Sequence, residues 1–109
     1  MTGILAEREF NLLADGMLAH IEAALEACAV EIDFEIEPGG VIEIECADGS
    51  KIIVNRHTAA REIWVAARAG GYHFKPDNGR WIAARDGTEL MAVLSACISA
   101  QAGATVRLS

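Results

Sequence analysis

The feature that most constrains the fold is a change in the spacing of apolar residues after Val30. Between Ala6 and Cys28 apolar residues recur every three or four positions, which predicts one long amphipathic helix. From Ile32 onward they recur at every second position, which is typical of half-buried strands. A sheet with one apolar face needs a cover, and the helix supplies it. The predicted helical stripe consists of Phe10, Leu13, Ala14, Met17, Leu18, Ile21, Leu25 and Cys28.

Short turn signals divide the alternating region into strands. The connections Pro38-Gly39-Gly40, Asp48-Gly49, Gly70-Gly71 and Asp77-Asn78-Gly79 are too short for crossovers, so the sheet is predicted to be antiparallel. In the first strand the inward residues are Ile32, Phe34 and Ile36, and in the second Ile42, Ile44 and Cys46. The predicted strands cover 32–37, 41–46, 51–56, 61–68, 72–75 and a short segment around Trp81.

A second helix is predicted after the sheet. Asp86 and Glu89 have the spacing of a capping box, and an apolar helical segment follows as far as Gly103, leaving 104–109 as a tail. The fold class is therefore α+β: a single domain over residues 1–109, a two-layer sandwich with two terminal helices on one face of a five- to six-stranded antiparallel sheet. The inward residues of the second helix are Leu90, Leu94, Cys97 and Ile98.

Charge and cysteine usage narrow the class of function. A formal net charge of −7 argues against nucleic acid as a partner and favours cations or a basic protein surface. The three cysteines form no CxxC pair, so they are interpreted as small buried hydrophobes. The chain has neither a basic, apolar leader nor an apolar run of about 20 residues, so we expect a cytoplasmic protein without a membrane segment.

Carboxylates occupy the outward positions of the first two predicted strands. They are Glu31, Asp33, Glu35, Glu37, Glu43 and Glu45. Because Ile36 and Ile42 must lie on the same side of the sheet, the connection must have an odd number of residues, which fits Pro38-Gly39-Gly40. Like charges directly opposite each other destabilise a sheet, so the pattern indicates either a solvated acidic surface or a cation site. The expected cross-strand pairs are Glu35 with Glu43 and Asp33 with Glu45.

The predicted first helix adds a stripe of acids beside its apolar face, at Asp15, Glu22 and Glu26. Carboxylates without convergent histidine or cysteine suit hard cations such as calcium, magnesium, manganese or iron. Such a surface would bind weakly, with water completing the coordination shell. The spacing does not choose among these cations.

A second candidate site lies on the solvent face of the predicted sheet. Ile53, Asn55 and Trp64 point outward there, with His57 and Arg68 as neighbours. An exposed tryptophan is typical of an interface centre, and the alternative is a minor surface cluster folded over its neighbours. The histidines lack metal-ligand spacing, and the sequence contains no nucleophile–base pair or phosphate-binding loop, so no catalytic site is predicted.

Several segments in order resemble the frataxin family, of the bacterial CyaY type. The matching segments are 48–56 (DGSKIIVNR), 62–66 (EIWVA) and 70–74 (GGYHF), with Phe10 to Asp15 near the start and Gln101 to Gly103 near the end. The resemblance extends from about Glu9 to Val106. It implies two helices over an antiparallel sheet, in agreement with the fold predicted from the residues.

The resemblance also implies weak, reversible iron binding and control of the cysteine desulfurase and scaffold protein that build iron–sulfur clusters. It places the partner-docking face at Asn55 and Trp64, which brings in their neighbours Ile53 and His57. This chain departs from the family in having histidine at position 57, where glutamine is usual, and alanines at the helix end, which implies weaker iron binding there. The implied iron-binding residues are Glu22, Glu26, Glu31, Asp33, Glu35 and Glu37.

Three functions follow as hypotheses. The first is a non-catalytic regulator whose acidic surface docks on the desulfurase while iron occupancy tunes the contact. The second is an iron chaperone that delivers ferrous iron to the scaffold. The third, a ferroxidase that stores iron, is disfavoured because no di-iron motif is present. We expect a monomer, or an oligomer that forms with iron, and neither nucleic acid nor a membrane as a partner.

Overall fold

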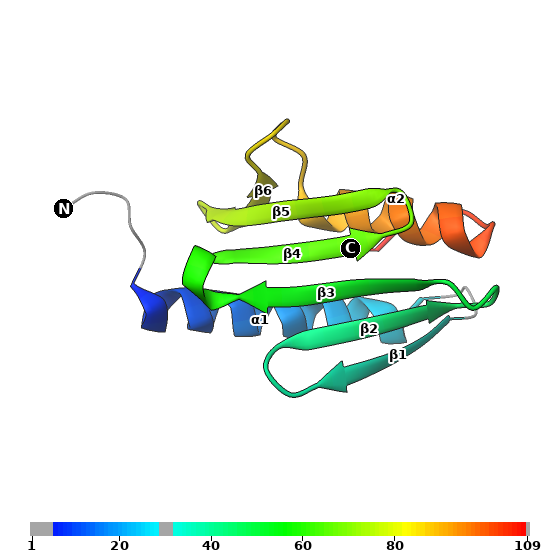
Figure 1. Cartoon of the computed structure of the whole chain (residues 1–109), viewed down its shortest axis with the longest axis horizontal. Coiled ribbons are helices and arrows are strands. Elements are labelled where there is room, and N and C mark those ends of the chain that lie inside the picture. Colours follow the sequence, from blue (N-terminus) through cyan, green and yellow to red (C-terminus); the bar gives the residue numbers. More distant parts are fainter. Residues whose placement is uncertain (1–5, 29–31, 109) are drawn as a thin grey trace.

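The computed structural model describes residues 6–28 and 32–108. Helix α1 (Glu7–Glu26) comes first, six strands follow, and helix α2 (Leu90–Ala102) comes last. Every strand pairs antiparallel with its neighbour in sequence, so the spatial order is the chain order. Both helices lie behind the same face of the sheet in Figure 1, which confirms the predicted two-layer α+β sandwich. The strands are β1 (Ile32–Glu37), β2 (Val41–Cys46), β3 (Lys51–His57), β4 (Glu62–Ala67), β5 (Gly70–Asp77) and β6 (Arg80–Ala83).

The core lies between the helices and the inward face of the sheet, where alternation along the central strands buries the predicted residues. Phe10 of α1 packs edge-on against Trp81 of β6, with ring centroids 5.9 Å apart. Cys46 and Cys97 are buried free thiols, and burial raises the pKa of both, as expected for small core hydrophobes. Within the described residues, neither helix is long and apolar enough to cross a bilayer. Fully buried sheet residues include Ile42, Ile44, Ile52, Val54, Ile63, Val65 and Phe74.

Two residues predicted to be inward are exposed. Leu13 is 45% exposed, because the adjacent Phe10 and Ala14 supply the buried stripe of α1 and turn Leu13 to its flank. Ile36 is 51% exposed, although its register partner Ile42 is buried. It lies near the end of β1, at the edge of the sheet, where the cover given by α1 is incomplete.

The predicted capping box is wrong, and the predicted tail packs against the core. Helix α2 begins at Leu90, and Asp86 instead accepts hydrogen bonds from the backbone N–H and hydroxyl of Thr88 within the preceding loop. After Gly103, which adopts the left-handed conformation that ends the helix, the chain turns back and buries Val106 and Leu108. The pair Gly70-Gly71 lies inside β5 and does not form the turn before it.

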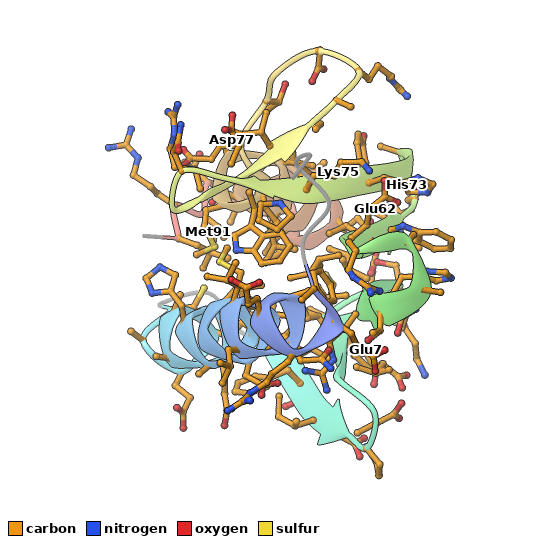
Figure 2. All side chains as sticks on the ribbon, turned by 90° about the vertical axis from the view of Figure 1, so that its left-hand side faces the viewer. Glu7, Glu62, His73, Lys75, Asp77 and Met91 are labelled. Atoms are coloured by element: carbon orange, nitrogen blue, oxygen red, sulfur yellow. The ribbon has the colours of Figure 1, made fainter. Side chains whose placement is uncertain are left out.

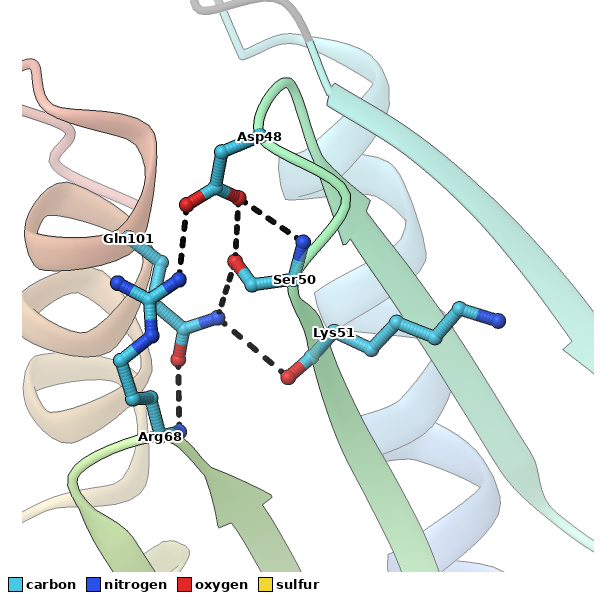
Figure 3. Close-up of polar contacts among 5 residues, drawn as sticks. All are labelled: Asp48, Ser50, Lys51, Arg68 and Gln101. Atoms are coloured by element: carbon cyan, nitrogen blue, oxygen red, sulfur yellow. Dashed lines mark hydrogen bonds and ion pairs between the residues drawn. The ribbon is translucent and has the colours of Figure 1, made fainter.

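A buried glutamine joins three segments that are far apart in sequence (Figure 3). The Gln101 side chain of α2, only 6% exposed, accepts a hydrogen bond from the backbone N–H of Arg68 at 2.9 Å. Its Nε2 donates to the Ser50 hydroxyl at 2.9 Å, and that hydroxyl donates to Asp48 at 2.6 Å. Hydrogen bonds from Ser50 and the Arg68 guanidinium hold the pKa of Asp48 below its ordinary value. The β2–β3 and β4–β5 turns are thereby fixed to the end of α2.

Candidate functional site

The acidic hairpin β1–β2 has the predicted register. Glu35 lies opposite Glu43, and Asp33 lies opposite Glu45. The connection contains three residues, and its two glycines, Gly39 and Gly40, have φ values of +87° and +82° that favour glycine. Because the alternate residues of both strands face the helices, these acids point to the opposite, solvent face of the sheet. The like-charged pairs are therefore real neighbours.

Lys51 moderates this charge, and it was not among the predicted site residues. Its Nζ lies 2.5 Å from Glu43 Oε2, and its own register partner on β2 is Glu45. The hydrogen bond and positive charge of Lys51 lower the pKa of Glu43, while Glu43, then Glu45 and Glu35, raise the pKa of Lys51. The alternation of β3, with Ile52 and Val54 inward, places Lys51 on the outward face, opposite Glu45. Lys51 therefore contacts Glu43 of β2, and its positive charge also interacts with Glu45 and with Glu35 of β1.

Replacing Glu35 with lysine is expected to stabilise the protein by about 0.2–1 kcal/mol, because an attractive pair with Glu43 replaces a repulsive one. Glu35→Gln is the matched control, since it removes the repulsion without adding an attraction and should gain less. Urea denaturation at low and high salt measures both, and salt should shrink the difference. A clear loss of stability in Glu35→Lys would contradict a repulsive pairing at this position.

The structure divides the predicted metal ligands between two sides of the sheet. Helix α1 covers the core face, so Glu22 and the exposed Glu26 lie on the helical side, away from Asp33 and Glu35 of β1. Glu22 and Glu37 line the same groove, between α1 and the β1–β2 turn. Asp15, at the same groove, forms an ion pair with Arg56. Glu31 lies outside the described residues.

Within residues 6–28 and 32–108, no three histidine, cysteine, aspartate or glutamate side chains converge closely enough to hold a metal ion. The donors that are present are carboxylate oxygens on an open surface. Such donors fit a hard cation that keeps part of its water shell. The metal assignment of these residues therefore stays a prediction.

Trp64 lies on the solvent face of the sheet, stacked between two imidazoles. Its ring centroid is 3.9 Å from that of His57 and 4.3 Å from that of His73, with interplanar angles of 13° and 10°. Its Nε1 donates to Glu62 Oε1 at 2.6 Å, and Glu62 also lies 3.5 Å from Lys75 Nζ. Figure 2 shows Glu62, His73 and Lys75 side by side on this face.

The sheet register explains this grouping. Asn55, Trp64 and His73 are successive partners across β3, β4 and β5, and Ile53 is half-buried two residues before Asn55. The tryptophan is therefore half-buried, with both ring faces covered, and its edge is what the surface presents. The alternation of inward and outward residues predicted Trp64 and His57 on this face. It did not single out His73, which the cross-strand register identifies.

These features define a class of protein: a small α+β sandwich with an acidic edge hairpin and an aromatic cluster on the open face of its sheet. The family model of the frataxin-like domain matches residues 4–104. The chain therefore belongs to the frataxin family, as the sequence resemblance predicted.

Relatives and solved structures agree with this assignment. The chain is 60% identical over 102 residues to the iron-sulfur cluster assembly protein CyaY of Dechloromonas aromatica, covering 94% of this chain and 97% of that protein. It is 51% identical over 105 residues to the protein of the same name from Cupriavidus taiwanensis, covering 94% and 95%. A solved frataxin from Psychromonas ingrahamii superposes with a TM-score of 0.87 at 30% identity, covering 96% of this chain and 99% of that one.

Proposed function

We propose that this chain is an iron-binding regulator of iron–sulfur cluster assembly that acts on the cysteine desulfurase and its scaffold protein in the cytoplasm. The names of its relatives support the pathway. The observation that carries the proposal is the pair of opposed carboxylates on the β1–β2 hairpin, Glu35 with Glu43 and Asp33 with Glu45. A sheet keeps like charges opposite each other at a cost in stability, which a bound cation or a basic partner surface offsets.

The acidic surface has a helical half on α1 and a strand half on β1, and we assign iron binding to both. We define the acidic ridge as Glu22, Glu26, Glu31, Asp33, Glu35 and Glu37. Carboxylates on this open surface would hold iron through a few oxygen atoms, with water at the remaining positions, so binding is weak and reversible. Lys51 already forms an ion pair with Glu43. On the strand half of the ridge, iron is therefore expected to bind most tightly at Asp33, Glu35 and Glu37.

The same ridge is the proposed docking surface for a basic patch of the desulfurase. The outward sheet face, with Ile53, Asn55, His57 and Trp64, is the proposed second contact with the assembled complex. Its half-buried indole, with a hydrogen-bonded Nε1, resembles the aromatic anchors found at interface centres. Iron bound on the ridge reduces the negative charge seen by the desulfurase, which links metal occupancy to docking.

Titration with ferrous iron, with and without the desulfurase, tests this function while sulfide production is followed. A regulator should change the rate of sulfide production, and the change should depend on iron and weaken steeply with salt. Reversing Asp33, Glu35 and Glu37 to lysine should abolish both iron uptake and desulfurase binding.

The competing function, an iron chaperone, predicts stoichiometric transfer of iron to the scaffold with an unchanged sulfide rate. If the variant with lysine at positions 33, 35 and 37 still binds the desulfurase normally, the acidic ridge is not the docking surface.

A further inference from the structure

The two edges of the sheet differ in how they are protected. At one edge, β6 is followed by a segment that folds back on it: Ile82 forms a bridge with Glu89, and the Ala83 N–H donates to the Thr88 carbonyl at 2.9 Å. At the other edge, β1 pairs with β2, and no further strand of the described residues pairs with its outer side. An edge strand of this kind presents a row of unpaired backbone donors and acceptors.

Strand β1 lacks several of the usual devices that block pairing at an edge. Its register with β2 is continuous from Ile32 to Glu37, so it contains no bulge. It contains neither proline nor lysine. What it carries instead is negative charge on its outward positions, which would repel the same strand of a second copy of this chain. The charge therefore selects against self-pairing and in favour of a basic strand.

The inward side of the same edge is apolar. Ile36 is 51% exposed, and it lines the groove between α1 and the β1–β2 turn together with Leu18 and Ala19. Glu22 and Glu37 lie at the same groove. A side chain that approached β1 from outside on this face would meet an exposed isoleucine next to two carboxylates.

We propose that β1 receives an extended basic segment of a partner protein as an added strand of the sheet. This inference rests on the proposed function and specifies how its acidic ridge recognises a partner. Alternate side chains of an added strand lie on opposite faces of the sheet. One set lies beside Asp33, Glu35 and Glu37, and the other beside Ile36. The recognised segment therefore alternates lysine or arginine with apolar residues, while backbone hydrogen bonds to β1 hold it.

Short capped peptides test this mode of binding directly. One peptide alternates lysine and valine, a second has the same composition with the lysines grouped together, and a third repeats the alternating sequence with N-methylated backbone amides. The alternating peptide should bind at least about tenfold more tightly than either of the others, with its largest amide shifts in β1. Equal affinity of the three peptides would overturn the inference, because charge alone would then account for binding.

Two substitutions locate the apolar contact. Ile36→Ser should reduce the preference for the alternating peptide by about tenfold or remove it, because the exposed isoleucine is lost. Leu12→Ser is the matched control, since Leu12 is 67% exposed but lies on α1 away from β1, and the preference should be unchanged. An Ile36→Ser protein that keeps the full preference would overturn the assignment of this groove.

The outcomes separate this inference from the proposed function. If the peptides bind alike while the Asp33, Glu35 and Glu37 charge reversal still abolishes desulfurase binding, strand addition is wrong and the acidic ridge stands. If the charge reversal leaves desulfurase binding intact while the alternating peptide keeps its preference, the proposed use of the ridge is wrong and the edge site stands.

Discussion

Replacing Gln101 with leucine is expected to lower the free energy of unfolding by about 1–3 kcal/mol, because buried polar groups lose their partners. Leucine fits a buried position but cannot accept the hydrogen bond from the Arg68 N–H or donate to the Ser50 hydroxyl. The β2–β3 and β4–β5 turns would then be held to α2 by packing alone. Urea denaturation measures the change, which should appear in the midpoint with an unchanged slope.

Ser50→Ala is the matched control for Gln101→Leu. It removes the hydroxyl between Gln101 and Asp48 but leaves the Arg68 N–H with its acceptor, so its cost should be smaller. It should also remove the hydroxyl hydrogen bond that helps to hold the pKa of Asp48 low. Equal stability of Gln101→Leu and the unchanged protein would show that the network contributes nothing to the fold.

Trp64→Ala is expected to weaken binding to the desulfurase–scaffold complex by about 2 kcal/mol, or roughly 30-fold, as truncation of a central aromatic commonly does. Stability should also fall, because each stacked partner contributes about 0.5–1.5 kcal/mol beyond burial and Trp64 stacks on both His57 and His73. Iron titration should be unchanged, since no carboxylate of the acidic ridge is altered. Calorimetric titration of the folded variant against the complex, beside a thermal melt, measures both effects.

Trp64→Phe separates the roles of the indole. It keeps an aromatic ring between the two imidazoles but removes the hydrogen bond from Nε1 to Glu62. We expect it to recover most of the stability and only part of the binding. If the Trp64→Ala protein folds and binds the complex normally, the docking face lies elsewhere on the protein.

Much of the fold followed from apolar spacing. Alternation identified the inward residues of β2, β3 and β4, where both neighbouring strands are present and burial follows orientation alone. The odd length of the Pro38-Gly39-Gly40 connection predicted the pairing of Glu35 with Glu43, because a loop of even length would have placed Ile36 and Ile42 on opposite faces. The resemblance to frataxins predicted the family, which the family match confirmed.

Two of the errors have a common physical origin, since they depend on contacts between distant segments, whereas the capping-box error is local. Alternation gives the face on which Ile36 lies, but the position of β1 at the edge decides how much of that side chain is covered. The stack of His57, Trp64 and His73 requires the register of three strands at once. Asp86 has capping-box spacing to Glu89, yet its partner is Thr88, because the preceding loop forms its own turn.

The unbroken order of the sheet governs how the chain can fold. Because each strand pairs with its neighbour in sequence, the sheet can grow hairpin by hairpin, and such local pairing favours rapid folding. The helices behave differently. Phe10 of α1 packs on Trp81 of β6, a strand that is synthesised only after β1 to β5. The apolar face of α1 therefore stays partly uncovered until β6 has been synthesised, and before that point the nascent chain is most open to association with other apolar surfaces.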